Sequence, residues 1–306
     1  MYTRILVPLD GSQLAEQVLP YALLVGKALK SRIRLLQVFE PLSPDLARPS
    51  HGMYLDQVSE AFRAKAQDYL ANVAEPMKKS GLVVSISVHE GSPAHYITEE
   101  AAAEPSTLVA MTTHGRSGVG RWLLGSVTDK VLHASNNPLL VIRPKEPASS
   151  PATAAITTII APLDGSALAE EGLPHVTTLS KALGAKVLLV RITPSASDYY
   201  RYMEYSVGPY RDFSVEIDAE ATEYLHRVSQ GLRLNSVASV EERLLHGNPA
   251  AAIIDLAKDI QDNLIAMTTH GRSGLGRWIL GSVADRVVRH SGGPVLMIHP
   301  TGAASL

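Results

Sequence analysis

Short apolar runs alternate with stretches of helical periodicity along the first part of the chain. The runs Arg4–Leu9 and Ile33–Phe39 are rich in branched residues, and they predict two strands. Between them, apolar residues recur at helical spacing and predict one helix, with the positions Leu14, Val18, Ala22, Val25 and Leu29. Strands that alternate with helices predict right-handed βαβ crossovers and therefore a parallel sheet.

The same alternation continues to residue 142. Helical spacing returns at Phe62, Ala66, Tyr69, Val73 and Met77, and the runs Val83–Val88, Thr107–Met111 and Leu139–Ile142 predict three more strands. Ser92-Pro93 predicts a helix start with a capping side chain before a proline at the first helical position, and Asn248-Pro249 repeats this arrangement.

Two segments of the first half return in the second half. Pro8–Ser12 recurs as Pro162–Ser166, and 10 of the 14 residues from Val7 match those from Ala161. Met111–Val131 recurs as Met267–Val287 with 17 of 21 residues identical. This internal repeat predicts two copies of one α/β domain. We place the domains at residues 1–144 and 157–300, joined by a proline- and serine-containing linker at 145–156.

Composition narrows the class of protein. The 306 residues are 45% hydrophobic and 19% charged, with a net charge of −2 that leaves neither half strongly basic. This balance argues against a nucleic-acid-binding surface. Because there is no cysteine, disulfides, thiolate metal sites and cysteine nucleophiles are excluded. The apolar runs are too short for a signal peptide or a membrane span, so we expect a soluble cytoplasmic protein without a membrane partner.

Candidate chemistry gathers where strands one and four end. In a doubly wound sheet, ligands bind beyond the carboxyl ends of the strands. Asp10 follows the first strand, Thr112–Gly115 follow the fourth, and a glycine-rich loop then leads to Gly125-Ser126. Glycines before a helix N-terminus favour phosphate binding. The loop matches neither a P-loop nor a dinucleotide fingerprint, because Ser126 and Val127 replace the P-loop residues and a third glycine is missing.

The repeated segments resemble the universal stress protein family. Its nucleotide-binding pattern is glycine, two residues, glycine, nine residues, then glycine followed by serine or threonine. The matching positions are Thr112, Gly115, Gly125 and Ser126 in the first copy and Thr268, Gly271, Gly281 and Ser282 in the second. The first glycine of the pattern is threonine in both copies, and a side chain there would crowd the ribose.

The resemblance implies two tandem flavodoxin-like or Rossmann-like domains, each a five-stranded, mainly parallel sheet with helices on both faces. It also implies ATP, ADP or AMP as the ligand, with an adenine pocket between Asp10, Val38 and Met111. Any Mg²⁺ would arrive with the nucleotide, because no cluster has metal-ligand spacing. The implied ATP-binding residues are Pro8, Asp10, Val38, Met111, Thr112, His114, Gly115, Gly125, Ser126, Val127, Thr128, Pro162, Asp164, Ile192, Met267, Thr268, His270, Gly271, Gly281, Ser282 and Val283.

Other roles for these residues stay open. Ser126 and Asp129 also match a helix-capping pattern, and Asp10 also suits a turn before a helix. His114 and His270 stand without a nucleophile or carboxylate recognisable by sequence, so we assign no catalytic residue. Ala284 replaces Thr128, so the second site lacks a hydroxyl that the first would offer to the terminal phosphates.

These observations favour a stress-response protein that binds ATP reversibly as a regulator. A slow ATP-hydrolysing enzyme and an interaction module that has lost its nucleotide are the alternatives. The resemblance also implies that the terminal strands, 139–142 and 295–298, pair within one chain as an internal pseudo-dimer. A further homodimer of whole chains stays open.

Overall fold

The computed structural model describes residues 2–40, 55–114, 124–144, 153–195, 214–271 and 280–300. The chain divides into two compact domains, residues 1–154 (domain 1) and 155–306 (domain 2), and each is described by itself. Gly115, most of the glycine-rich loop and most of the linker lie outside the described residues. The pairing of the two terminal strands stays a prediction.

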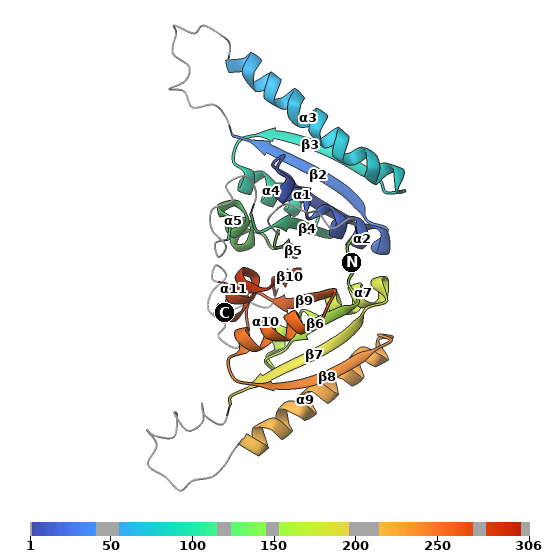
Figure 1. Ribbon diagram of the computed structural model, residues 1–306, viewed down its shortest axis with the longest axis vertical. Helices are drawn as coiled ribbons and strands as arrows, with labels where there is room; N and C mark the ends of the chain where they lie inside the picture. Colours follow the sequence, from blue (N-terminus) through green and yellow to red (C-terminus); the bar gives the residue numbers. More distant parts are fainter. Residues whose placement is uncertain are drawn as a thin grey trace, which may run out of the picture. The chain divides into compact units, whose positions relative to one another are not determined.

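Domain 1 is a parallel five-stranded sheet with strand order β3-β2-β1-β4-β5 (Figure 1). The register brings the first strand, which ends at Pro8, alongside the second, with Pro8 opposite Leu36. The elements are β1 (Arg4–Pro8), α1 (Gln13–Glu16), α2 (Leu19–Leu29), β2 (Arg32–Phe39), α3 (Leu55–Lys79), β3 (Val84–Glu90), α4 (Pro93–Ala102), β4 (Thr107–Thr112), α5 (Ser126–Ala134) and β5 (Leu139–Ile142).

Domain 2 repeats this arrangement with the order β8-β7-β6-β9-β10, again parallel throughout. The elements are β6 (Thr158–Pro162), α6 (Ala167–Glu170), α7 (Leu173–Leu183), β7 (Lys186–Thr193), α9 (Ser214–Leu234), β8 (Val240–His246), α10 (Pro249–Asp259), β9 (Asn263–Thr268), α11 (Ser282–His290) and β10 (Val295–Ile298). The predicted fold, two tandem α/β domains with parallel sheets, is confirmed.

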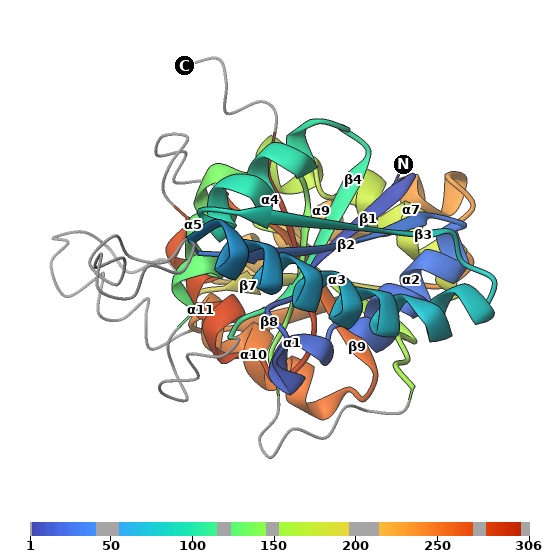
Figure 2. The ribbon, with the colours of Figure 1, turned by 90° about the horizontal axis from the view of Figure 1, so that it is seen from above.

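The connections place helices on both faces of each sheet. In domain 1, α2 and α3 lead outward through β2 to β3, whereas α4 and α5 lead the opposite way to β4 and β5. Because such crossovers are right-handed, the two pairs of helices cover opposite faces, as Figure 2 shows. The α3 helix packs on β2 and β3, and α4 packs on α5. Helices α4 and α1 contact β4, all of whose residues are buried.

Two local predictions need correction. The helix predicted from Leu14 to Leu29 is two helices, α1 and α2, and Pro20 lies in the first turn of the second. Proline lacks the N–H that a continuous helix would require there, so the helix has to restart.

The side-chain caps predicted at Ser92 and Asn248 are present at only one of these two places. Asn248 accepts a hydrogen bond from Ala251 N at 3.1 Å, whereas Ser92 precedes α4 without a side-chain capping bond.

None of the helices in the described part of the chain combines the length and apolar character needed to cross a membrane.

Candidate functional site

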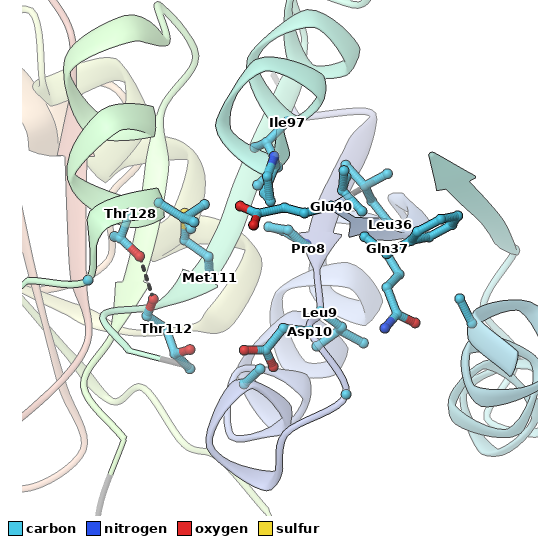
Figure 3. Close-up of a pocket in the computed structure, with 18 of the residues that line it drawn as sticks. Pro8, Leu9, Asp10, Leu36, Gln37, Glu40, Ile97, Met111, Thr112 and Thr128 are labelled. Carbon is cyan, nitrogen blue, oxygen red and sulfur yellow. Dashed lines mark hydrogen bonds between the residues drawn. The ribbon is translucent and has the colours of Figure 1, made fainter. Parts of the chain in front are cut away.

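A cavity of about 750 Å³ opens at the carboxyl ends of β1, β2 and β4 in domain 1 (Figure 3). The first turn of α5 and residues of α3 and α4 complete its wall. Apart from Gly115, which lies outside the described residues, every site residue predicted for domain 1 lines this cavity: Pro8, Asp10, Val38, Met111, Thr112, His114, Gly125, Ser126, Val127 and Thr128. The parallel topology therefore brings together residues that are more than 100 positions apart.

The turn after β1 is organised by Asp10. Its Oδ1 accepts hydrogen bonds from Ser12 N at 2.9 Å and from Ser12 Oγ at 2.6 Å. Ser12 in turn caps α1 by accepting a bond from Ala15 N at 3.1 Å. Gly11 completes the turn with a φ of 83°, a conformation that favours glycine. The turn-forming role that the sequence left open for Asp10 is present, and it leaves the carboxyl group on the cavity wall.

The corresponding turn in domain 2 has the same geometry. Asp164 Oδ1 accepts bonds from Ser166 N at 2.9 Å and Ser166 Oγ at 2.6 Å. Its other oxygen, Oδ2, occupies the space that a Cβ atom on Gly271 would need. Glycine is therefore required at position 271 by the approach of a carboxylate from the turn after β6. Two residues predicted for one site are thus in contact.

The threonine that replaces the first glycine of the pattern has a structural partner in both domains. Thr112 Oγ1 donates to the carbonyl oxygen of His114 at 2.8 Å, and Thr268 Oγ1 donates to that of His270 at 2.7 Å. Both threonines are buried. The hydroxyl therefore closes the turn that follows the strand, and this local bond explains why threonine fits where the family pattern has glycine.

The start of α5 is held by backbone contacts. Gly125 is the N-cap residue, its N–H donates to Thr113 O at 2.8 Å, and no side chain caps the helix. Ser126 is the first helical residue, so it does start the helix, but the N-cap is Gly125 and not Ser126. A Cβ atom on Gly125 would lie 2.8 Å from Thr113 O, which is closer than real Cβ atoms approach. Glycine here permits two backbone segments to touch and leaves the first turn of α5 facing the cavity.

Domain 2 repeats this helix start. Gly281 is the N-cap of α11, its N–H donates to Thr269 O at 2.9 Å, and no side chain caps the helix. Its predicted site residues therefore also lie at the carboxyl ends of parallel strands and at a helix start, namely Pro162, Asp164, Ile192, Met267, Thr268, His270, Gly271, Gly281, Ser282 and Val283.

The Thr128 hydroxyl has a different partner from the one predicted. Thr128 Oγ1 donates to the carbonyl oxygen of Thr112 at 2.9 Å, and both residues are buried (Figure 3). The hydroxyl hydrogen expected to reach the terminal phosphates is therefore used to fasten α5 to the end of β4. Ala284 at the equivalent place in domain 2 lacks this attachment.

The two loop histidines are hydrogen-bonded through Nδ1. His114 Nδ1 lies 2.9 Å from Thr113 Oγ1, and His270 Nδ1 lies 3.0 Å from Thr269 Oγ1. Each contact orients the imidazole beside the strand end. Over the described ranges, no group of three or more histidine and carboxylate side chains is placed to hold a metal ion.

Sequence reasoning missed part of the cavity wall. Gln37 of β2 and a stripe of α3 line the cavity, the stripe being Phe62, Lys65, Ala66 and Tyr69. Gln37 is 8% exposed, and its Oε1 has no hydrogen-bond partner. A polar residue inside an otherwise apolar buried strand was the available signal for Gln37. The α3 residues gave only a helical period, which does not reveal what the helix covers.

Comparisons with known proteins agree with this architecture. The model of the universal stress protein family matches residues 1–143 and again 155–299. A universal stress protein of Mycolicibacterium smegmatis is 22% identical over 298 residues, covering 97% of each chain. A shorter one from Methanocaldococcus jannaschii is 29% identical over 143 residues, which cover 47% of this chain and 83% of that protein.

Solved structures show the same fold. The crystal structure of a universal stress protein from Archaeoglobus fulgidus has a TM-score of 0.71 at 22% identity, with 98% of this chain and 99% of that chain covered. A second structure, from Pseudomonas aeruginosa, has a TM-score of 0.67 at 18% identity, covering 99% and 95%. With two family matches that together span nearly the whole chain, this protein belongs to the universal stress protein family, as a tandem of two such domains.

Proposed function

We propose that this protein binds an adenine nucleotide (ATP, ADP or AMP) reversibly and acts as a nucleotide-dependent regulator in the stress response. The observation that carries the proposal is the domain 1 cavity, which joins an apolar region to an uncapped helix start. Its volume of about 750 Å³ falls within the roughly 300–1,000 Å³ typical of small-molecule sites.

The phosphate end of the proposed site is the first turn of α5. The first N–H groups of a helix have no partner within the helix, and the helix dipole adds positive potential at the same place. Gly125 provides no side-chain cap that would compete for these donors. Ser126 and Val127 line the cavity, whose wall carries the charged residues Lys65, Asp10 and Glu40. The preference for an anionic group therefore comes from the unpaired N–H groups and dipole of the helix start.

The base end is apolar. Val38, Met111 and Ile97 come from β2, β4 and α4 and line the same cavity. An apolar slot beside a phosphate cradle suits a purine ring, because burial of the ring removes apolar surface from water. Mg²⁺ would enter with the phosphates, and its charge would be balanced by them.

Binding without rapid turnover is supported by how the polar groups are engaged. Asp10 Oδ1 holds the Ser12 turn, and His114 Nδ1 contacts Thr113. Neither arrangement resembles a base poised to activate water, and the P-loop lysine is missing from the sequence. We therefore favour a regulator over the alternative of a slow ATP-hydrolysing enzyme.

The test removes one helix N–H without breaking the helix. Ser126 is the first residue of α5, and the ψ of 144° at Gly125 suits a residue before proline. Ser126→Pro should therefore keep the helix while deleting one amide donor. Calorimetry with ATP and Mg²⁺ should show binding weakened by roughly 10–100-fold, the equivalent of one hydrogen bond to a charged group. Adenosine binding should change little.

Ser126→Ala is the matched control, because it removes the hydroxyl and retains the amide. It should bind ATP within a few fold of the wild type. Circular dichroism and melting of both variants check that the helix persists. If the wild-type chain shows neither heat of binding nor thermal stabilisation with ATP, ADP or AMP, the proposal fails.

A further inference from the structure

One wall position differs in chemistry between the two domains. Pro8 at the end of β1 pairs with Leu36, and Pro162 at the end of β6 pairs with Val190. The next residue along each outer strand is Gln37 in domain 1 and Arg191 in domain 2. The register therefore makes these two side chains structural equivalents.

In domain 1 this position borders open space. Gln37, Gly11 and Tyr69 all line the cavity. The Tyr69 hydroxyl donates to Glu16 Oε1 at 2.9 Å, so the tyrosine is held against α1. The buried Gln37 Oε1 lacks a hydrogen-bond partner, and a buried acceptor of this kind is normally satisfied. A ligand N–H inside the cavity would satisfy it.

In domain 2 a guanidinium group occupies the corresponding space. A Cβ atom on Gly165, the counterpart of Gly11, would overlap Nη1 of Arg191. The Cζ atom of Arg191 lies 4.9 Å from the ring centroid of Tyr224. Arg191 thus reaches from the turn after β6 to the ring on α9. The matching residues of domain 1, Gly11 and Tyr69, both line the cavity.

Two carboxylates act on the tyrosine ring that this guanidinium group contacts. Burial and the charges of Glu170 and Asp164 raise the pKa of Tyr224, and the charge of Arg191 opposes them. Glu170, Asp164 and Arg191 therefore each interact electrostatically with Tyr224. A second guanidinium, that of Arg227, lies 5.2 Å from the same ring. A ligand entering here would have to displace Arg191 from an aromatic face and from neighbouring negative charge.

We propose that Arg191 closes the nucleotide pocket of domain 2, so that each chain binds a single nucleotide, in domain 1. This inference rests on the proposed function. The equivalent residues Gln37 and Arg191, together called position 37/191, would then decide which domain binds nucleotide. The duplicated glycines and helix starts then provide a phosphate cradle in both domains, and in domain 2 Arg191 fills the part of the pocket that Gly11, Gln37 and Tyr69 border in domain 1.

The experiment exchanges the two residues in the full chain and counts bound nucleotide by calorimetry with ATP and Mg²⁺. The wild type should bind one ATP per chain, Arg191→Gln two, and Gln37→Arg none. Arg243→Gln is the matched control, because it removes the same charge from an exposed position of domain 2 and should leave one site. Melting curves check that each variant folds.

Photolabelling with 8-azido-ATP, followed by peptide mapping, locates the site without any substitution. Label confined to domain 1 peptides of the wild type supports the inference. Two sites in the wild type, label in domain 2, or a folded Arg191→Gln chain that still binds one nucleotide would overturn it while leaving the proposed function intact. A wild-type chain that binds no nucleotide removes both.

Discussion

The two domains share the parts of the site that are made by backbone and differ in parts made by side chains. Both place a glycine N-cap against a strand-end carbonyl and an aspartate–serine turn after the first strand. They differ at two equivalent positions, because Gln37 of domain 1 corresponds to Arg191 of domain 2 and Thr128 corresponds to Ala284. Backbone geometry admits few substitutions, because a single added atom collides. A side chain in the cavity wall can change access to the cavity, or the attachment of a helix to a strand, without disturbing the fold. Such positions are therefore free to diverge after a duplication.

Substitution of the N-cap glycines should produce the largest loss of stability. Gly125→Ala would bring its Cβ atom to 2.8 Å from Thr113 O, and Gly281→Ala to 3.0 Å from Thr269 O. We expect a cost of about 1–3 kcal/mol for the first, typical of overpacking, and a smaller cost for the second. Hydrogen exchange measured by mass spectrometry on peptides of β4 and β9 reports each domain separately.

Gly231→Ala provides the control for this pair. Nothing lies within 4 Å of the added atom, and the residue is inside α9. Alanine there should stabilise domain 2 by about 0.5–1 kcal/mol. If Gly125→Ala is as harmless as this control, the close backbone approach is not the reason for glycine.

Removal of the Thr128 hydrogen bond should produce the second-largest loss of stability. Thr128→Ala gives domain 1 the residue of domain 2 and leaves Thr112 O without its 2.9 Å donor. We expect domain 1 to lose about 1–2 kcal/mol, the cost of breaking one buried hydrogen bond. Thr128→Ser, which keeps the hydroxyl, should restore most of it. Ala284→Thr tests the reverse exchange, and a loss of stability there would show that the two helix starts are not equivalent. The readout is hydrogen exchange in α5 and α11.

The serine caps should show where the domains behave alike. Ser12 and Ser166 accept from Ala15 N and Ala169 N at 3.1 and 3.2 Å, respectively. Replacing either by alanine should cost about 1 kcal/mol, equal in the two domains within error. Hydrogen exchange in β1 and β6 measures this loss of stability. Clearly unequal losses would mean that the two caps contribute differently to the stability of their domains.

The smallest effect concerns a polar cluster at the end of β8. His246 Nε2 lies 2.8 Å from Asp218 Oδ2, and this hydrogen bond, assisted by one from Thr193, lowers the pKa of Asp218. His246→Ala should raise that pKa and cost less than about 1 kcal/mol at neutral pH, because the pair is partly exposed.

The direction of the pH dependence follows from the lowered pKa. The stabilisation is present above the unfolded-state pKa of Asp, about 3.9, and is lost as the pH falls through the lower folded pKa. The difference between wild type and His246→Ala should therefore shrink in acid. Carboxyl-carbon NMR titration measures the pKa, and an unchanged Asp218 in the variant would contradict this account.

The sequence by itself determined the duplication, the alternation of strands and helices, and the gathering of Asp10, Thr112 and Ser126 at one sheet edge. Each follows from a local pattern and from the rule that parallel strands end together. Chain periodicity could not reveal that the predicted helix from Leu14 to Leu29 divides in two. The signal for the division was Pro20, whose missing N–H interrupts a helix although the apolar spacing around it is continuous.

Only the tertiary structure decided what each site residue touches. The Thr112 hydroxyl closes its own turn, that of Thr128 fastens a helix, and the α3 residues became a cavity wall. Position 37/191 is the clearest case, because glutamine and arginine both read as a polar residue in a buried strand. Gln37 lines the cavity, whereas Arg191 packs on the Tyr224 ring of α9 and on the turn at Gly165. Packing between distant segments, which no local pattern encodes, settles that difference.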